Sequence, residues 1–236
     1  MAIGVTPSAV GLRSIRLLAG IENEKLTTLA QQCHWRRFTA GQRVTSRQTG
    51  DRDVYVIVGG KVRITAFSAA GRQITFRDIG TGDWFGELAA IDGRFRSADV
   101  EALEDSVLAS MQPAVVRRLL HEHPAVCDRV LDRLVSVVRD LSDRVFDFST
   151  LGVQNRVHAE LLRLAKEAGI ERNTARLEPA PKHSEIASKV STYREQVTRE
   201  VSTMVKQGLL QRVERALIIP DVARLEQIVA EVRRLT

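Results

Sequence analysis

The chain lacks the features that several large classes of protein require. Its 236 residues include only two cysteines, Cys33 and Cys127, which lie far apart and not in the spacing of metal ligands. No apolar run approaches the roughly 20 residues of a membrane-spanning helix. The first 20 residues contain no long apolar block of the kind that marks a secretory signal. These absences favour a reduced, cytoplasmic protein.

The residues of a catalytic centre are missing as well. The sequence has no His-Asp pair, no cluster of histidines and aspartates, and no nucleophile motif. Metal-assisted hydrolysis would need such a cluster or a base that positions water. We therefore expect a protein that is not an enzyme and that carries no metal.

Positive charge is concentrated toward the C-terminus. Residues 151–236 hold 15 Lys and Arg against 11 Asp and Glu, a net charge of +4, whereas residues 1–150 hold 20 against 18, a net charge of +2. This bias is expected if the C-terminal part binds nucleic acid. Alone it decides little, because many basic domains bind nothing anionic.

Residues 35–111 have the pattern of a compact all-β domain. Runs rich in β-branched residues occur at 54–58, 61–65, 72–76 and 99–103, with glycines between them. Short, regularly spaced runs with turn signals are typical of a barrel or a roll. Ahead of this domain, residues 22–32 are predicted to form a short helix.

A long helix is predicted next, because neither glycine nor proline interrupts the chain between Pro124 and Gly152. Its apolar residues recur in steps of three and four. The predicted seam consists of Cys127, Val130, Leu134, Val137, Leu141, Arg144 and Phe148. A seam this regular favours a symmetric interface between two helices, and the alternative is a helix that packs on its own domain. Arg144 does not fit an apolar seam.

The C-terminal part has the order of a winged helix-turn-helix. Two short helices, SEIASKV and YREQVTREVSTMVKQ, are followed by a β-hairpin, QRVERALIIP, and a final amphipathic helix over 221–235. On the second helix, Arg194, Glu195 and Arg199 are predicted to be exposed. The opposite, buried stripe is predicted to be Val190, Val197, Val201 and Val205.

The exposed face of that helix has the chemistry of a base reader. A guanidinium matches the two acceptors of guanine in the major groove, and a carboxylate can accept from the amino group of cytosine. Two alternatives remain open. Thr192 and Glu195 could form a capping box, and Arg199 could pair with Glu195 on the surface for only about 0.3–0.5 kcal/mol.

The stretch FGELAAIDGRFRSA, residues 85–98, combines a carboxylate, two arginines, a hydroxyl and two glycines in one short segment. It is either a solvated turn between strands or a pocket for a ligand that carries an anion and a sugar hydroxyl.

These segments, in this order, resemble the cAMP receptor protein and fumarate-nitrate regulator superfamily, and its cAMP receptor protein branch in particular. The resemblance covers roughly residues 20–220 and is sharpest in FGELAAIDGRFRSA and EIASKVSTYREQVTREVSTMVKQGLL. It implies an α+β fold with a jelly-roll-like cyclic-nucleotide-binding β-roll, a long dimerisation helix and a winged helix-turn-helix. The expected boundaries are an N-terminal arm over 1–20, the β-roll over 21–112, linking helices over 113–149, the DNA-binding domain over 150–220 and a C-terminal helix over 221–236.

The resemblance also assigns roles in FGELAAIDGRFRSA. It implies that Glu87 accepts a hydrogen bond from the ribose 2′-hydroxyl, that Arg96 pairs with the cyclic phosphate and that Ser97 donates its hydroxyl. Arginine's planar fork suits the phosphate oxygens. Gly86 would allow close approach of the backbone, and Leu88 and Ala89 would begin a short helix whose free N–H groups favour an anion. Arg94 does not match the motif and is expected to be solvated.

The base contacts depart from the family's pattern. The family's adenine-contacting Thr-Ser pair falls on Leu141 and Ser142, and Leu141 cannot hydrogen-bond a base. A site rejects an analogue best through polar groups that would otherwise be left unpaired. We therefore expect a cyclic nucleotide, cAMP by preference, with cGMP as a second candidate.

For DNA, the resemblance places Arg194, Glu195 and Arg199 on the family's base-reading positions. It implies a pseudo-palindromic, double-stranded operator with TGTGA-like half-sites, a homodimer formed through residues 125–149, and contact with RNA polymerase if the protein is an activator. Predicted phosphate contacts are Lys182, His183 and Ser184. Ser191 replaces the usual glycine of the turn, which would cost roughly 1 kcal/mol if its φ is positive.

Other members of the superfamily define the alternatives. An iron–sulfur sensor needs four thiolates, and a ligand-independent regulator would be expected to lose Glu87, Arg96 or Ser97. A haem sensor would need one of four histidines, His34, His121, His123 and His158. A cyclic-nucleotide-binding protein without DNA function, or a cyclic-nucleotide phosphodiesterase, would not need the helix-turn-helix.

Overall fold

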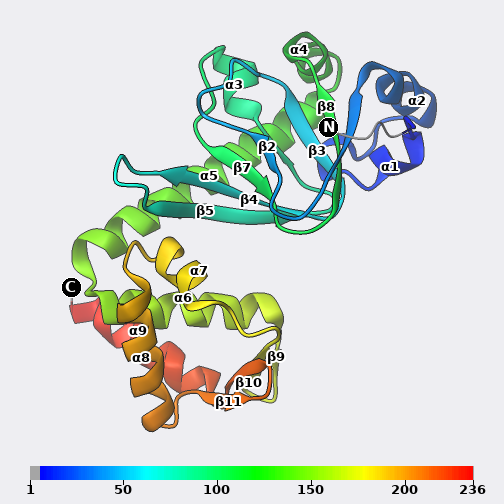
Figure 1. The fold of residues 1–236 in the computed structure, drawn as a ribbon. Coiled ribbons are helices and arrows are strands. Elements are labelled where there is room, and N and C mark those ends of the chain that lie inside the picture. Colours follow the sequence, from blue (N-terminus) through cyan, green and yellow to red (C-terminus); the bar gives the residue numbers. More distant parts are fainter. Residues whose placement is uncertain (1–5, 236) are drawn as a thin grey trace. The chain divides into compact units, whose positions relative to one another are not determined.

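The computed structural model describes residues 6–235, so residues 1–5 of the predicted N-terminal arm and Thr236 lie outside the described residues. The chain forms two compact units, residues 1–137 and 138–236. Helix α5 (Pro124–Thr150) belongs to both, because the boundary falls within it (Figure 1).

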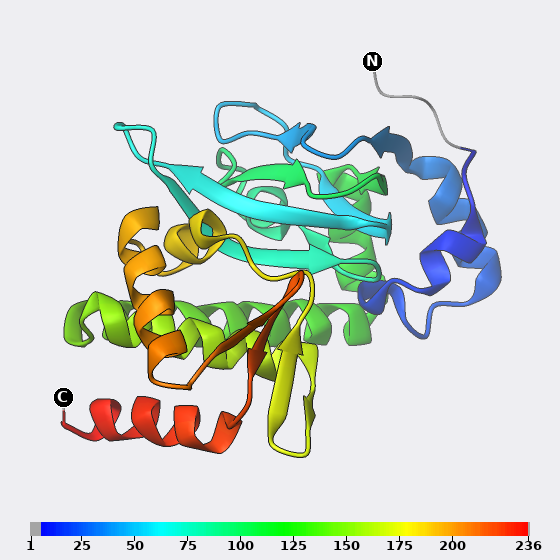
Figure 2. The same ribbon diagram turned by 60° about the horizontal axis from the view of Figure 1, so that its bottom comes forward.

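The first unit is a roll of two four-stranded antiparallel sheets. One sheet has the order β1 (His34–Phe38), β8 (Ser106–Met111), β3 (Val54–Gly59), β6 (Trp84–Phe85), and the other has the order β2 (Arg43–Thr45), β7 (Asp99–Ala102), β4 (Lys61–Phe67), β5 (Gln73–Gly80). Strands β4 and β5 form a long hairpin that projects from the roll (Figure 2). The expected β-roll and its four predicted strands are confirmed.

Two apolar cores hold this unit together. Between the sheets, Tyr55 and Phe85 are cross-strand partners whose rings stack 5.0 Å apart. The second core lies under helices α1 (Ala9–Arg13), α2 (Asn23–Gln32), α4 (Pro113–Glu122) and the first half of α5. The segment expected to be an arm, together with the short helix η1 (Arg16–Leu18), supplies it with Leu12, Ile15, Leu17 and Leu18, each at most 2% exposed. Full burial of such a side chain contributes about 1.5–3 kcal/mol.

The first half of the predicted seam lies on the side of α5 that packs against the first unit, so the prediction that it faces a partner helix is wrong. Val130 is buried in the core of the first unit and Leu134 packs against that core. The exposed apolar stripe instead runs one residue later, with steps of four, three and seven residues. Its members are Leu131, Val135, Val138 and Val145, which are 53–64% exposed. Periodicity fits both registers, and only packing on the roll distinguishes them.

The second unit is a winged helix-turn-helix, as predicted. Helix α6 (Val153–Ala168) is followed by the hairpin β9 (Ile170–Glu171) and β10 (Thr174–Leu177), which the polar sequence there did not predict. Helices α7 (His183–Lys189) and α8 (Arg194–Lys206) come next, then β11 (Gln211–Val213), β12 (Ala216–Ile219) and α9 (Val222–Leu235). The strands form one sheet in the order β11, β12, β10, β9.

Helix α8 sits on the core of this unit through Val197, Val201 and Met204. Val205, which was predicted to be buried, is only partly so, because Met204 occupies that place in the stripe. The capping-box alternative is wrong: α8 begins at Arg194, and the hydroxyl of Thr192 donates to the side chain of Gln196 instead.

Arg144, the exception in the predicted seam, is bound within the second unit. Its Nη2 donates to the carbonyl of Lys189 at 2.8 Å, and Arg156 Nε donates to the next carbonyl, that of Val190, at 3.1 Å. Both guanidiniums lie over the ring of Phe148, at 5.8 and 5.4 Å. The end of α5 is therefore tied to the end of α7, where backbone carbonyls lack helical partners.

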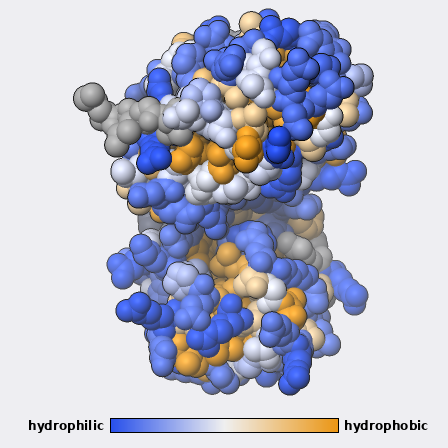
Figure 3. Space-filling model, turned by 90° about the vertical axis from the view of Figure 1, so that its right-hand side faces the viewer, coloured by the Kyte–Doolittle hydropathy of each residue, from blue (hydrophilic) through white to orange (hydrophobic). Residues whose placement is uncertain are grey.

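Most of the face drawn in Figure 3 is hydrophilic, with hydrophobic residues gathered in patches between charged ones. Within residues 6–235, no helix has both the length and the apolar character needed to span a bilayer.

Candidate functional site

The segment FGELAAIDGRFRSA folds as a tight turn, a short helix α3 (Glu87–Asp92) and a loop. Gly86 begins it with φ +97°, in the left-handed region that favours glycine. A Cβ at this position would lie 2.4 Å from Arg96 Nη1 and 2.6 Å from the carbonyl oxygen of Asp53. Glycine is required here because the guanidinium of Arg96 packs directly on the backbone.

Arg96 is only 5% exposed and is fixed by the ends of its guanidinium. Nη2 donates to Asp51 Oδ2 at 2.8 Å and to the carbonyl of Asp53 at 2.6 Å, and Nη1 donates to the carbonyl of Gly86 at 3.2 Å. The guanidinium also lies 5.5 Å from the centre of the Tyr55 ring. Its position is therefore set before any ligand arrives.

Asp51 is the counter-ion of this arginine. It also accepts from the hydroxyls of Tyr55, at 2.9 Å, and Thr45, at 3.1 Å. Burial alone would raise the pKa of Asp51, but hydrogen bonds from Arg96 and from the backbone N–H of Asp53, with the charge of Arg96, hold it below its ordinary value. Burial and the charge of Asp51 raise the pKa of Tyr55. The carboxylate is charged and the phenol neutral at neutral pH.

Glu87 faces the same interior and is 6% exposed. Its Oε1 lies 3.8 Å from Nη2 of Arg77 on β5, and its Oε2 has no hydrogen-bond partner. Arg96 Nε is also buried without a partner. Buried polar atoms are nearly always paired, so an unpaired acceptor and an unpaired donor in one segment indicate groups that a ligand completes.

The other predicted ligand contacts are spread more widely. Ala89 is buried, whereas Leu88 is 44% exposed and Ser97 is exposed. Arg94 is exposed, as expected of a solvated charge. Leu141 and Ser142 belong to the second unit, where the hydroxyl of Ser142 donates to the carbonyl of Val138 at 2.9 Å. Their contact with a nucleotide stays a prediction.

Three charged groups at this site were missed in the sequence. Asp51 and Asp53 stand immediately before a buried strand, and Arg77 interrupts a strand whose neighbouring residues Thr75 and Ile79 are buried. The sequence signal for these residues was a charged side chain placed next to, or within, a run of residues that form a buried strand.

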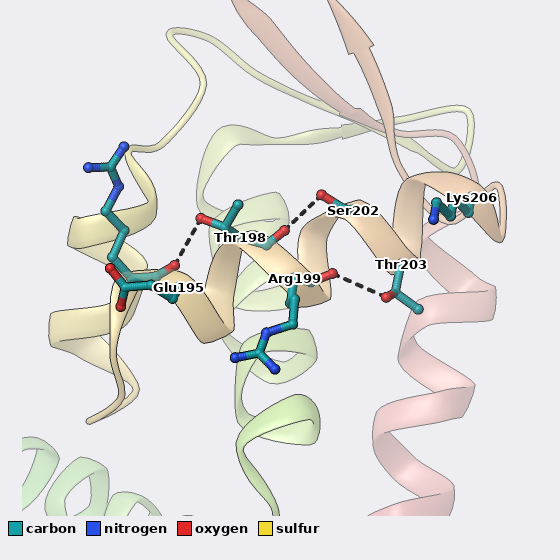
Figure 4. A pocket seen from close by; sticks show the side chains of 7 residues that line it. Glu195, Thr198, Arg199, Ser202, Thr203 and Lys206 are labelled. Carbon is teal, nitrogen blue, oxygen red and sulfur yellow. Dashed lines mark hydrogen bonds between the residues drawn. The ribbon is translucent and has the colours of Figure 1, made fainter.

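The second candidate site is the exposed face of α8. Arg194, Glu195 and Arg199 are all exposed, as predicted. Figure 4 shows Glu195 and Arg199 projecting from the helix together with Thr198, Ser202, Thr203 and Lys206. The hydroxyls of Thr198, Ser202 and Thr203 each donate to the carbonyl four residues earlier. The two arginines and Glu195 are exposed on this face and carry the donors and the acceptor that match base edges.

Basic groups flank this face. Lys182 and Ser184 are exposed at the start of α7, and His183 Nδ1 lies 2.7 Å from the hydroxyl of Thr198 on α8. Burial lowers the pKa of His183, and the charges of Arg212 and Arg194 lower it further. Arg212 and Arg194 place positive charge near His183 beside α8, which suits phosphate.

The histidines do not gather. His34 and His121 are exposed, and His158 is buried 2.6 Å from Glu200 of α8. Over the described part of the chain, no three His, Cys, Asp or Glu side chains are placed to hold a metal ion. Burial, and then the charge of Asp53, raise the pKa of Cys33 to about 12, so its thiol stays protonated.

Comparison with known proteins matches both halves of the chain. Residues 35–123 match the family model of the cyclic nucleotide-binding domain, and residues 155–228 match that of the Crp-like helix-turn-helix domain.

Relatives align along nearly the whole chain. A CRP-like cAMP-activated global transcriptional regulator of Mycobacterium tuberculosis is 26% identical over 211 residues, covering 89% of this chain and 94% of the relative. The cAMP-activated global transcriptional regulator Vfr of Pseudomonas aeruginosa is 26% identical over 200 residues, covering 82% and 92%. Among solved structures, a CooA mutant from Carboxydothermus hydrogenoformans superposes with a TM-score of 0.77 at 18% identity, covering 97% of this chain and 98% of that one.

The relatives are transcription regulators and not enzymes. The chain belongs to the cAMP receptor protein and fumarate-nitrate regulator superfamily and is a cyclic-nucleotide-responsive, DNA-binding regulator of transcription.

Proposed function

We propose that the first unit binds a purine 3′,5′-cyclic mononucleotide, cAMP or cGMP, through Gly86, Glu87 and Arg96. One observation carries the proposal: Arg96 Nε and Glu87 Oε2 are buried without partners. A cyclic phosphate supplies an acceptor for the first, and the ribose 2′-hydroxyl supplies a donor for the second. Ser97 adds a hydroxyl at the rim, and Leu141 and Ser142 remain the proposed base contacts.

The nucleotide acts by changing the geometry of a homodimer. The exposed stripe of Leu131, Val135, Val138 and Val145 on α5 is the surface that a second copy would cover. Because α5 continues into the second unit, where Arg144 and Arg156 bind the end of α7, a displacement of α5 reaches the helix-turn-helix directly. The ligand shifts this equilibrium only by its difference in affinity for the two arrangements.

The dimer places two copies of α8 in successive major grooves, about 34 Å apart. Arg194, Glu195 and Arg199 read base edges of TGTGA-like half-sites, and Lys182, His183 and Ser184 contact phosphates. An activator would also contact RNA polymerase.

Calorimetric titration of the purified protein with cAMP and with cGMP tests the ligand site. Arg96→Gln and Glu87→Gln should each weaken binding at least tenfold, since each removes one of the two unpartnered groups. Arg94→Gln, on an exposed arginine of the same loop, is the matched control and should bind like wild type. Binding within about twofold of wild type in both site variants would refute the assignment.

Two further measurements test the regulator. Fluorescence anisotropy should detect tighter binding to a TGTGA-type palindrome when the nucleotide is present, and no change would refute the coupling. Sedimentation velocity should detect a dimer that Val138→Glu dissociates and that Val10→Glu, on another exposed valine, leaves intact. A wild-type monomer, or a Val138→Glu dimer, would refute the stripe as the interface.

A further inference from the structure

Helix α8 begins at a residue whose side chain does little to stabilise it. Tyr193 is the N-cap of α8, and its side chain makes no capping hydrogen bond. Serine, threonine, asparagine and aspartate are favoured at this position, because a short polar side chain there accepts from a free backbone N–H. The ring of Tyr193 is 63% exposed, more than any other aromatic ring in the described part of the second unit. The side chain therefore supplies no cap and little packing.

The backbone of Tyr193 is nevertheless held in place. Its carbonyl accepts from the N–H of Gln196 at 3.1 Å and from that of Val197 at 3.3 Å. The preceding residue, Thr192, is buried, and its hydroxyl donates to the side chain of Gln196. A tyrosine side chain has only two torsions to order. A partner that covers the ring would therefore meet it at low cost in conformational entropy.

The position of Tyr193 indicates that this partner is DNA. In a helix-turn-helix, the N-terminal residues of the second helix contact base edges in the major groove, and Tyr193 directly precedes Arg194 and Glu195. A tyrosine can meet DNA with its hydroxyl on a phosphate, or with its ring on the C5-methyl group that thymine displays in the major groove.

The N-cap position decides between these two contacts. A phosphate contact needs only a hydroxyl, and serine or threonine would provide one while also being able to cap the helix. Only the ring distinguishes tyrosine from these better caps. The ring is therefore the group that needs a partner.

We propose that the ring of Tyr193 reads the methyl group of a thymine in the operator, an inference that rests on the proposed operator binding. The guanidinium of the next residue, Arg194, matches O6 and N7 of guanine, so the thymine should lie beside a guanine. In a TGTGA-like half-site, each guanine follows a thymine. Cytosine or uracil at that place lacks the methyl group and would leave the ring uncovered.

Fluorescence anisotropy of the full chain, with saturating cAMP or cGMP, tests this proposal. The duplexes are a TGTGA palindrome, the same palindrome with each thymine in turn replaced by deoxyuridine in both half-sites, and random DNA. Deoxyuridine keeps the base pair and removes only the methyl group. The proteins are wild type, Tyr193→Phe, Tyr193→Ser and a matched control, Ile170→Ser, which changes another exposed apolar side chain of the second unit.

Wild type and Tyr193→Phe should lose about tenfold on one deoxyuridine palindrome, because burial of a methyl group contributes roughly three- to fourfold at each half-site. Tyr193→Ser should bind the thymine palindrome about tenfold more weakly than wild type and should not respond to that deoxyuridine. On random DNA it should stay within about twofold of wild type, since that binding is electrostatic. Ile170→Ser should match wild type throughout.

Thermal denaturation separates this contact from a structural role of the ring. Serine restores the cap, so Tyr193→Ser should raise the unfolding temperature of the second unit by about 3–6 °C while it weakens operator binding. A lower unfolding temperature would make the ring a structural element and would overturn the proposal.

The binding data can overturn the proposal in three further ways. Tyr193→Phe could lose as much as Tyr193→Ser, which would assign the contact to the hydroxyl and a phosphate. Tyr193→Ser could weaken random DNA as much as the palindrome, or could respond to deoxyuridine as wild type does. In each case wild type still prefers the palindrome, so the proposed function stands. Wild type that binds the palindrome no better than random DNA would refute the proposed operator binding together with this inference.

Discussion

Replacing Asp51 by asparagine should have two effects of opposite sign. The carboxylate accepts from Arg96, Tyr55 and Thr45, and asparagine keeps the shape and one acceptor oxygen while removing the charge. A hydrogen bond to a charged group contributes about 1.5–3 kcal/mol against about 0.5–1.5 for a neutral one. With Arg96 left without its counter-ion, the free protein should lose about 2–3 kcal/mol in the free energy of unfolding of the first unit.

The affinity for cyclic nucleotide should rise in the same variant. Asp51 and a phosphate at Arg96 Nε would lie on different sides of one guanidinium, roughly 6 Å apart. Two unit negative charges at this distance repel each other by about 1.5–3 kcal/mol if the effective dielectric constant is about 20–40. Removing the carboxylate should tighten binding by about 10- to 100-fold.

Calorimetry with cAMP and cGMP, and urea denaturation with and without ligand, measure both effects. The control is Asp92→Asn, an exposed carboxylate of the same segment that lies 3.9 Å from Nε of the exposed Arg94. It should change affinity by less than about threefold. Weaker binding in Asp51→Asn would refute the reasoning, because it would mean that the carboxylate's main role is to orient Arg96.

The same variant makes a prediction about acid stability. Since the pKa of Asp51 is lowered on folding from its ordinary value of 3.8, the native state holds this proton less tightly than the unfolded state. The resulting stability is fully present above about pH 4 and is lost as the pH falls toward the folded pKa. Between pH 5 and 3, wild type should lose more stability than Asp51→Asn, and parallel pH profiles would contradict the lowered pKa.

Three other substitutions give separate tests. Gly86→Ala should destabilise the first unit by about 2 kcal/mol or more in thermal denaturation, because the added Cβ would lie 2.4 Å from Arg96 Nη1. The same variant should not bind nucleotide, and normal binding would contradict the tight packing of Arg96 on Gly86. Ser191→Gly should stabilise the second unit by roughly 0.5–1 kcal/mol in urea denaturation, since Ser191 has φ +55°, and unchanged or lower stability would contradict strain at this serine. Arg199→Ala should cost about 1–3 kcal/mol on the specific operator by anisotropy, and an equal loss on random DNA would make Arg199 a phosphate contact.

Both functional segments could be predicted because each depends on a short, contiguous pattern. The nucleotide-binding segment is marked by a glycine followed directly by a carboxylate, and by an arginine nine residues after that carboxylate. The alternation of Val197 and Val201 with Arg194 and Arg199 fixes the exposed face of α8. For Ser191, the glycine usual in the family raised the condition of a positive φ, and φ is +55° in the structure.

The register of α5 could not be predicted, since two apolar stripes run along it with the same period. Val130 and Leu134 follow one stripe, and Leu131 and Val135 follow the other. The choice depends on which stripe the first unit covers, and the core that covers it gathers residues from Leu12 to Val130. Periodicity identifies the helix but not its buried side.

The counter-ions could not be predicted either, and they change how the ligand site works. Asp51 is 45 residues from Arg96, and Arg77 reaches Glu87 from another element, so no local motif contains either pair. With Asp53 included, the groups carry two positive and three negative charges, so the site has no net positive charge before a ligand enters. Net attraction for an anion therefore contributes little, and affinity must come from the unpartnered Nε and Oε2 and from the base. Nucleotide binding should accordingly depend only weakly on salt, unlike operator binding, whose affinity should fall steeply with salt concentration because phosphates release counter-ions.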